Sequence, residues 1–273
     1  MTLAPPDQPQ IIDFIIPVRH PTTVVDWEVV KKNLSETIKS ISAQTAPNWR
    51  AVIIANDCAD LPETPPGFTV RRVNFPPKFL PSRDVDPEAF FEAVRSDKGR
   101  RILEGFKELK PSSYVMIVDY DDFISNRLAA HVADKKAANG WYFSTGYVYS
   151  GSRLTYIYHD FFEFCGTSLI IRADLFGLPD DLSQVPELIV RRNLGSHKFI
   201  TKDLEARGQA LESLPYPGAV YRVGHQGTTS GSRKLLSEML PRWMLRHRPI
   251  EYVRRATRFR WMTASRRREF SIP

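Results

Sequence analysis

Three short apolar runs, each followed at once by polar or charged side chains, constrain the fold of this chain most. The runs cover residues 11–18, 50–54 and 115–118, and the polar groups after them begin at Arg19, Asn56 and Asp119. Branched and apolar runs of this length, bounded by turn residues, are typical of buried strands. Because the carboxyl ends of parallel strands meet at one edge of a sheet, we expect one polar site there, where open α/β sheets bind ligands.

The segments between these runs alternate between helix and strand. Asp26 can cap a helix whose apolar residues follow helical spacing up to Gln44, and residues 68–73 form another predicted strand. The four prolines of residues 74–87 predict a loop that is flexible or wrapped on the surface. A helix is predicted over residues 88–109, with a candidate break at Gly99. This alternation predicts a parallel sheet with crossover connections.

The second half of the chain has a less regular pattern. It predicts a helix over residues 123–136, a strand pair around residues 141–149 and 154–158, and a further apolar segment over residues 164–171. With 273 residues, the chain suits one large α/β domain or a domain with an appendage. No apolar run has the length of a membrane span, and the first ten residues do not resemble a secretory signal. The only two cysteines, Cys58 and Cys165, lack metal-ligand spacing, which indicates a reduced, cytoplasmic setting.

The net charge of +7 is concentrated at the end of the chain. Residues 231–273 contain 12 Arg or Lys and 3 acidic residues, a local charge of +9, so the other 230 residues carry −2. Aromatic residues such as Trp243 and Trp261 are interleaved with these arginines. This combination suits an anionic membrane surface and also RNA, or a basic helical appendage packed on its own domain. The body is close to neutral and has no RNA-binding motif. We therefore expect the tail to bind the inner face of a membrane, and we expect no nucleic acid partner.

The carboxylates Asp119, Asp121 and Asp122 follow the third run directly. Like charges this close raise one another's pKa values unless a positive charge lies among them. A divalent cation carrying a polyphosphate is the natural partner, because Mg²⁺ and Mn²⁺ prefer carboxylate oxygens. The alternatives are a solvated acidic turn, or Asp122 as the N-cap of the helix predicted over residues 123–136.

Other polar residues are weaker candidates. Arg19 or His20 can line the same crevice, and Asp57 can accept a hydrogen bond from a nucleotide base, although Asn56–Asp57 also suits a plain turn. The basic cluster that includes Arg100 and Arg101 can contact phosphate or be solvated. His225, in a loop rich in glycine and hydroxyl side chains, can touch a metal or a diphosphate, or have no role.

The order of these features resembles the family 2-like glycosyltransferases of the GT-A fold over residues 11–231. Residues 14–18 look like that family's first strand, and residues 51–57 look like its second strand with the nucleotide-contacting aspartate, here Asp57. Residues 118–122 look like its Asp-x-Asp motif, and residues 164–176 are similar to its glycine-containing acceptor segment. No single motif is decisive, but their order and spacing are specific.

The resemblance implies a Rossmann-like α/β fold, with a mixed, mostly parallel central sheet flanked by helices. It divides the domain into a nucleotide-binding half over about residues 11–122 and an acceptor half over about residues 123–231. The basic, helical extension of residues 232–273 follows.

The activity implied by the resemblance is transfer of a sugar from a nucleotide diphosphate, UDP-linked, to a hydroxyl of a sugar or glycolipid, as in bacterial surface polysaccharide or glycoconjugate synthesis. Mn²⁺ or Mg²⁺ would be held by Asp121, with Asp122 and His225 as further ligands. The resemblance implies that Asp57 and Asp119 bind the donor, and the full set of predicted donor-binding residues is Pro17, Arg19, Asp57, Arg100, Arg101, Asp119 and Tyr120. Gly166, Thr167 and Ser168 would contact the acceptor.

One departure from the family pattern concerns the catalytic base. The family places an acidic pair about eleven residues before a glycine that closes a helix, and counting back from Gly208 reaches Ser196–His197. His197 can still act as a base, since a histidine pKa near neutrality suits that task, and Asp203 or Glu205 are alternatives. The base and the stereochemistry of transfer therefore stay open.

Two other functions are compatible with the sequence. A sugar-phosphate nucleotidyltransferase can share the sheet and the carboxylates, but the chain lacks a glycine-rich, basic loop after the first strand. A non-catalytic nucleotide-sugar-binding scaffold, with a basic tail that recruits partners, would explain the altered position at His197. The sequence also leaves a homo-oligomer open.

Overall fold

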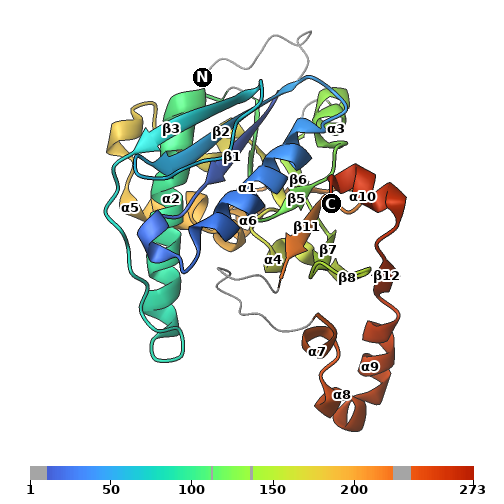
Figure 1. The fold of residues 1–273 in the computed structure, drawn as a ribbon. Helices are drawn as coiled ribbons and strands as arrows, with labels where there is room; N and C mark the ends of the chain where they lie inside the picture. Colours follow the sequence, from blue (N-terminus) through green and yellow to red (C-terminus); the bar gives the residue numbers. More distant parts are fainter. Residues whose placement is uncertain (1–10, 112, 136–137, 224–234) are drawn as a thin grey trace.

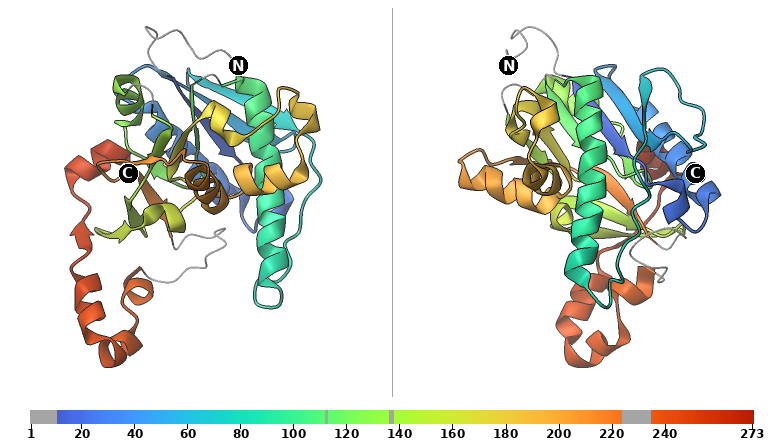
Figure 2. Two further views of the ribbon diagram at one scale, coloured as in Figure 1. Left: turned by 180° about the vertical axis from the view of Figure 1, so that it is seen from behind. Right: turned by 90° about the vertical axis from the view of Figure 1, so that its left-hand side faces the viewer.

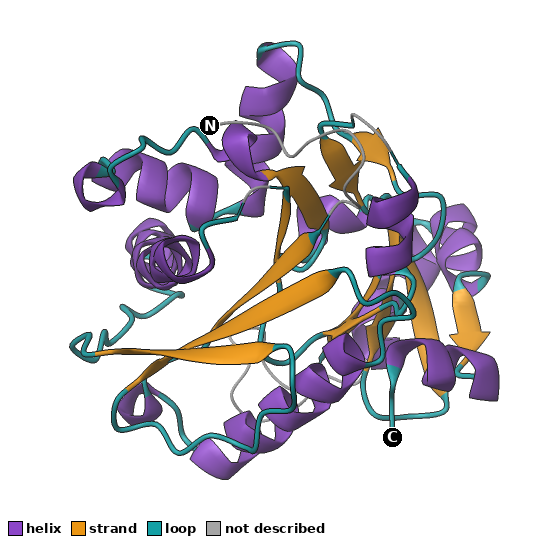
Figure 3. Cartoon of the chain, turned by 90° about the horizontal axis from the view of Figure 1, so that it is seen from above, coloured by secondary structure: helices purple, strands orange, loops and turns teal. Residues whose placement is uncertain are grey.

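The computed structural model describes residues 11–111, 113–135, 138–223 and 235–273, and these form a mixed α/β fold (Figure 1). Two mixed β-sheets are flanked by helices (Figure 3), so the α/β class expected from the sequence is confirmed. In the first sheet the strand order is β10-β6-β9-β4-β1-β2-β3.

Four neighbouring strands of the first sheet run parallel: β1 (Ile12–Pro17), β2 (Trp49–Asn56), β3 (Phe68–Val73) and β4 (Tyr114–Ile117). Beyond β4, strand β9 (Leu169–Arg172) is antiparallel to both of its neighbours, β4 and β6 (Gly140–Tyr142). The short edge strand β10 (Glu212–Ser213) pairs in parallel with β6. The strands expected from the three apolar runs are therefore present.

Strand β1 is buried at every position because helices cover both faces of the sheet. Its alternate residues Phe14 and Ile16 share a core cluster with α1 (Trp27–Ser42), whereas Ile15 packs with α2 (Pro87–Leu109). This alternation explains the continuous apolar run, since successive side chains of a strand point to opposite faces. Asp26 caps α1 as expected, and its side chain accepts hydrogen bonds from the backbone of the first turn.

Helix α2 runs unbroken past Gly99, so the expected break there is wrong (Figure 2). The glycine serves packing instead, because a Cβ at Gly99 would lie 2.2 Å from the backbone oxygen of Val190. Gly105, on the face towards β1, is similarly close to the side chain of Ile15. Both glycines let α2 approach its neighbours more closely than a larger residue would allow.

The second sheet has the order β12-β8-β7-β11-β5. Its strands are β5 (Phe123–Ile124), β7 (Thr145–Tyr149), β8 (Leu154–His159), β11 (Ala219–Arg222) and β12 (Phe259–Trp261). The antiparallel pairing of β7 with β8 confirms the expected strand pair, but the predicted strand over residues 141–149 is divided, because residues 141–142 belong to β6 of the first sheet.

The start of the helix predicted over residues 123–136 is wrong. Helix α3 (Leu128–Asp134) begins five residues later, because Phe123 and Ile124 pair with β11 as strand β5. Asp122 is therefore not a helix N-cap. The remaining helices are α4 (Phe161–Phe164), α5 (Glu187–Ile189) and α6 (His197–Ala206), with 3-10 turns at Pro21–Thr23, Ala173–Phe176 and Leu182–Gln184 and a π-helical turn at Val190–Leu194.

The C-terminal extension is mostly helical, as expected, and contains α7 (Leu235–Met239), α8 (Arg242–His247), α9 (Pro249–Ala256) and α10 (Ala264–Phe270). Helices α7 to α9 project from the body, whereas α10 lies against it (Figure 1). Between them, β12 joins the second sheet by pairing with β8, which the sequence did not predict. The expected boundary at residue 231 lies outside the described residues. Among the described helices, none is long and apolar enough to cross a membrane.

Candidate active site

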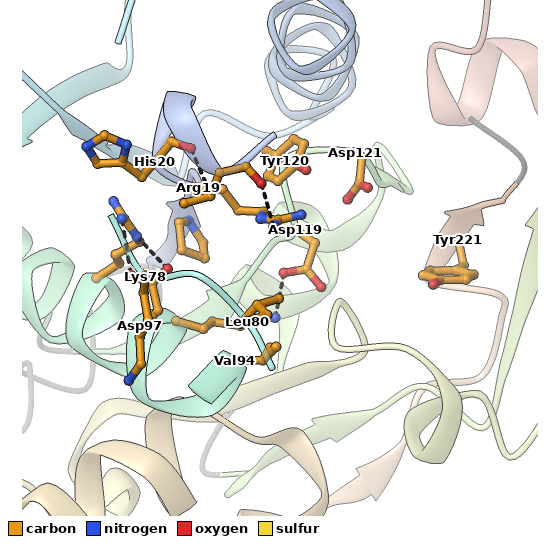
Figure 4. A pocket seen from close by; sticks show the side chains of 14 residues that line it. Arg19, His20, Lys78, Leu80, Val94, Asp97, Asp119, Tyr120, Asp121 and Tyr221 are labelled. Atoms are coloured by element: carbon orange, nitrogen blue, oxygen red, sulfur yellow. Dashed lines mark hydrogen bonds and ion pairs between the residues drawn. The ribbon is translucent and has the colours of Figure 1, made fainter. Parts of the chain in front are cut away.

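A cavity of about 180 Å³ opens where β1 and β4 end side by side (Figure 4). After β1 the chain builds β2 and β3 on one side and then returns to place β4 on the other. This is the topological switch point of the sheet, where open α/β folds bind ligands. We call this space the first cavity. It is lined by Pro17, Arg19, His20, Thr23, Lys78, Leu80, Val94, Asp97, Lys98, Arg101, Asp119, Tyr120, Asp121 and Tyr221.

The predicted residues are only partly brought together. Six of the predicted donor and metal residues line the first cavity: Pro17, Arg19, Arg101, Asp119, Tyr120 and Asp121. His20, expected in the same crevice, lines it too. Asp57 is exposed and Arg100 forms an ion pair with Glu187 at 3.4 Å, and neither lines this cavity.

Asp119 is held in place by two neighbouring side chains. Its carboxylate forms an ion pair with Lys98, and its backbone N–H donates to Thr167 Oγ1 at 2.9 Å. A Cβ at Gly166 would lie 2.9 Å from both Lys98 Nζ and Asp119 Oδ2, so glycine makes room for this pair. Burial opposes the charged form of Lys98, yet the Asp119 carboxylate raises the pKa of the ammonium above its ordinary value.

The predicted acceptor segment supports the site from the interior. Thr167 and Ser168 are fully buried, and Ser168 Oγ donates to the backbone oxygen of Cys165 at 2.6 Å. Neither residue lines the first cavity. Gly166 and Thr167 nevertheless lie next to residues that do, since Gly166 makes room for Lys98 and Asp119 and Thr167 bonds to the Asp119 backbone.

Asp121 and Asp122 occupy different environments although they are adjacent. Burial and the nearby Asp119 carboxylate raise the pKa of Asp121, which lines the first cavity, to about 7. Asp122 is fully buried behind the cavity, where it accepts hydrogen bonds from Cys165 Sγ and from the backbone N–H of Arg222, both at 3.3 Å. Burial and Asp121 also raise the pKa of Asp122 well above its ordinary value. Asp122 thus connects β5 with β11, whereas Asp121 faces the first cavity.

Helix α2 supplies one wall of the first cavity. Its first turn is fixed by Asp86, whose side chain accepts from Ala89 N, and by Pro87 at the first helical position. The buried Arg101 donates to Asp97 one turn earlier and, at 2.9 Å, to Asn56 Oδ1 at the end of β2. This network locks α2 against the sheet, and it neutralises the Arg101 charge within the protein.

Sequence reasoning missed several lining residues. Lys78 and Leu80 come from the proline-rich loop, which carried only a turn signal. Tyr221 comes from β11 in the second sheet and lies on the opposite side of the cavity from His20 (Figure 4). Its distance along the chain from the other lining residues left no local pattern to find. Lys98 belongs to the basic cluster noted in the sequence, but nothing distinguished it from Arg100.

The two predicted base residues lie apart. His197 begins α6, and its Nε2 lies 3.5 Å from the backbone oxygen of Glu163. Burial and the Lys98 ammonium lower the pKa of His197 to about 4, so the near-neutral pKa expected for it is wrong. Asp203 forms an ion pair with Arg192 at 3.0 Å and lines neither this cavity nor the second one described below.

The first cavity suits a cation that is bound partly by the protein and partly by a ligand, rather than one bound by protein side chains alone. Within the described ranges, no three His, Cys, Asp or Glu side chains are grouped so that they could hold a metal ion. His225, predicted as a further ligand, lies outside those ranges. Mg²⁺ is usually bound by one or two carboxylates together with substrate phosphates and water. Asp121, which faces the first cavity, satisfies that smaller requirement.

A second cavity of about 460 Å³ lies between the second sheet and the extension. Aromatic side chains form part of its wall, and the rings of Tyr158 and Phe164 are stacked with centroids 4.4 Å apart. Phe164 also packs edge-on against Tyr221 of the first cavity at 5.0 Å, so the two cavities share an aromatic wall. The charged lining residues are Asp160, Glu163, Lys198, Glu251, Arg254, Arg255 and Arg258.

Comparisons with known proteins give little further information. No family model matches the chain, and no curated protein matches it significantly. Among solved structures, a crystal structure of Rv0371c from Mycobacterium tuberculosis H37Rv is 10% identical, covers 83% of this chain and 92% of its own, and has a TM-score of 0.39. A second crystal structure of Rv0371c, a complex with manganese, is 10% identical, covers 78% and 92%, and has a TM-score of 0.38. These likenesses are too distant to support a statement about this chain.

Proposed function

We propose that this protein is a glycosyltransferase that moves a sugar from a nucleoside diphosphate, UDP in the first instance, to an acceptor hydroxyl. The observation that carries the proposal is the meeting of Asp119, Asp121 and Arg19 in one cavity at the switch point between β1 and β4. Carboxylates for a cation and a basic side chain for phosphate are the groups that a nucleoside diphosphate needs. The sheet order and the Asp-x-Asp run together favour the GT-A form of this fold.

Different residues of the first cavity would bind different parts of the nucleotide-sugar donor. Asp119, fixed by Lys98 and Thr167, suits the hydroxyl groups of the ribose or the sugar. Asp121 would hold Mn²⁺ or Mg²⁺, and the bound cation would offset the negative charge that develops on the departing diphosphate. At about 180 Å³ the first cavity is smaller than the roughly 300–1,000 Å³ of pockets that enclose a whole ligand. A nucleotide-sugar would therefore fill it with only part of its length.

We assign the acceptor to the second cavity. Aromatic faces beside carboxylates and guanidinium groups suit a saccharide, since sugar C–H faces pack on rings and hydroxyls bond to charged groups. Its volume of about 460 Å³ lies within the usual range for ligand pockets. In the transfer step, the acceptor oxygen bonds to the anomeric carbon, the bond to the diphosphate breaks, and the acceptor proton passes to a base. Glu163, which lines this cavity, is the first candidate. His197, which contacts the backbone oxygen of Glu163 but does not line the cavity, is the second.

The first experiment measures donor binding. Thermal unfolding with UDP and Mn²⁺ should show a higher melting temperature than with either alone, because a ligand that binds only the folded state stabilises it. Asp121→Asn should weaken Mn²⁺-dependent UDP affinity by at least about tenfold. The matched control is Asp180→Asn, an exposed carboxylate outside both cavities. Unchanged Mn²⁺-dependent affinity in Asp121→Asn would remove Asp121 from the donor site.

The second experiment identifies the reaction. A screen of nucleotide-sugars should find one from which the protein releases nucleoside diphosphate, slowly with water and faster with an acceptor. Release of pyrophosphate from a nucleoside triphosphate and a sugar phosphate would show a nucleotidyltransferase instead. Binding without turnover of any donor would leave a non-catalytic nucleotide-sugar-binding protein.

A further inference from the structure

The C-terminal extension carries an unusual concentration of exposed apolar side chains. Of the eleven large apolar side chains that are exposed in the described part of the chain, six lie in the segment 236–261: Leu236, Trp243, Leu245, Ile250, Val253 and Trp261. Single exposed apolar residues are normal, but a group of them on one projecting element marks an interaction surface.

In helix α9 the apolar side chains point to solvent and charged side chains point to the protein. Ile250 and Val253, one turn apart, are 86% and 60% exposed. Glu251 and Arg255, which pair at 3.0 Å, turn inwards and line the second cavity. No residue of α9 is fully buried. An amphipathic helix normally turns its apolar face to the protein, so α9 is inverted and its apolar face is directed to something outside the chain.

The charge around this face indicates what that partner is. Exposed arginines lie in the same segment as the apolar side chains: Arg242, Arg246, Arg248 and Arg260. A second copy of the chain docked symmetrically on this face would bring these arginines towards one another, which is unfavourable. An anionic lipid surface offers both an apolar interior for the tryptophans and aliphatic side chains and phosphates for the arginines.

We propose that α8, α9 and β12 form a face that binds an anionic lipid bilayer. Trp243, Ile250 and Val253 enter the boundary between headgroups and acyl chains, while the arginines contact lipid phosphates. Because the inner side of α9 lines the second cavity, this orientation brings that cavity to the membrane surface. That consequence rests on the proposed function, in which the acceptor is then a saccharide carried by a lipid. The bilayer face itself does not depend on it.

The test is sedimentation of the full chain with vesicles. We expect binding to phosphatidylcholine vesicles with about a quarter phosphatidylglycerol at least about tenfold tighter than to phosphatidylcholine alone, and weaker as salt rises. The double variant Ile250→Ser/Val253→Ser should lose at least about tenfold in affinity for the anionic vesicles. Its control, Val25→Ser, changes a side chain that is even more exposed but lies far from the extension along the chain.

A second pair of variants tests the charge. Arg242→Gln/Arg246→Gln should weaken binding to anionic vesicles only, whereas Lys32→Gln/Lys39→Gln, exposed lysines of α1, should not. Equal vesicle binding by the wild type and Ile250→Ser/Val253→Ser would overturn the proposal. So would a concentration-dependent dimer that this double variant abolishes, because the face would then belong to a second copy. The melting temperature of each variant without ligand shows that it is folded. UDP affinity, measured in parallel, tests the proposed function separately.

Discussion

At the scale of single residues, Asp121 has an environment that does not favour its charge. Its pKa is raised from 3.8 to about 7 because it is partly buried beside Asp119. The unfolded chain therefore ionises at lower pH than the folded protein, and the stability due to the protonated carboxyl is lost as pH rises from about 4 to about 7. A site that binds a cation can retain such a residue, since the cation restores the balance of charge.

The first prediction follows from this loss of stability with rising pH. Without metal, Asp121→Asn should be more stable than the wild type at pH 8 by about 1–3 kcal/mol, and the difference should shrink towards pH 4. Thermal unfolding in a chelator should show it as a melting temperature higher by about 2–12 °C at pH 8. Asp180→Asn should follow the wild type at every pH. A pH-independent difference for Asp121→Asn would mean that its carboxyl does not titrate in this range.

The second prediction concerns the base. Glu163→Gln should lower the rate of transfer by at least about a hundredfold without changing UDP affinity, because the Glu163 carboxylate lines the second cavity and can accept the acceptor proton. Asp203→Asn should stay within about twofold, since its carboxylate is paired with Arg192 outside both cavities. His197→Asn should cause a smaller loss, because burial and the Lys98 ammonium lower the pKa of His197 to about 4 and make its imidazole a weak base. A large loss in Asp203→Asn would contradict this reading of the site.

The residues of the site were predictable where they follow a strand directly. Arg19, Asp119 and Asp121 occupy the ends of β1 and β4, and the apolar pattern alone fixes those ends. On α2 the choice depends on which side of the helix faces the cavity. Lys98 and Arg101 face it, whereas Arg100 pairs with Glu187 elsewhere. Because the whole cluster is basic, only the packing of α2 on the sheet could separate these residues.

At the scale of elements, α2 is positioned by two close contacts at glycine. The third prediction is that Gly99→Ala lowers the free energy of unfolding by about 1–3 kcal/mol, because its Cβ would meet the backbone oxygen of Val190 at 2.2 Å. This exceeds the gain of up to about 1 kcal/mol from the higher helix propensity of alanine. Urea unfolding measures the difference.

The control is Arg100→Ala, at the next position of the same helix. It removes an exposed ion pair and should change stability by less than about 1 kcal/mol. Since Arg100 lies outside the first cavity, UDP affinity should also be unchanged. A stabilised Gly99→Ala variant would show that the segment at Val190 can move away from α2 at little cost.

The elements that sequence patterns missed are those formed by pairing between distant segments. Phe123 and Ile124 continue an apolar pattern that suits a helix. They form a strand of the second sheet instead, because they pair with β11, which lies almost a hundred residues later in the chain. The same is true of β12, a short strand that exists because β8 offers it an edge. Local propensity could not reveal either, because both depend on tertiary contacts.

At the scale of the whole molecule, the extension first leaves the body and then returns to it. Phe270 of α10 is 1% exposed and packs in a core cluster with Phe123, Tyr147 and Val220. Glu269 accepts hydrogen bonds from Ser125 Oγ at 2.7 Å and from Arg127 Nε at 3.0 Å. The end of the chain is thus part of the folded core, and deleting the extension would disturb the body as well as the proposed bilayer face.

The fourth prediction separates these two roles within one segment. Phe270→Ala should cost about 3–5 kcal/mol and lower the melting temperature by about 6–15 °C, because it empties a buried aromatic site. Trp261→Ala, at a position 66% exposed, should change stability by less than about 1 kcal/mol but weaken binding to anionic vesicles. If Trp261→Ala instead destabilised the protein as much as Phe270→Ala, this part of the extension would serve the fold. The bilayer face would then have to lie on α8 and α9 alone.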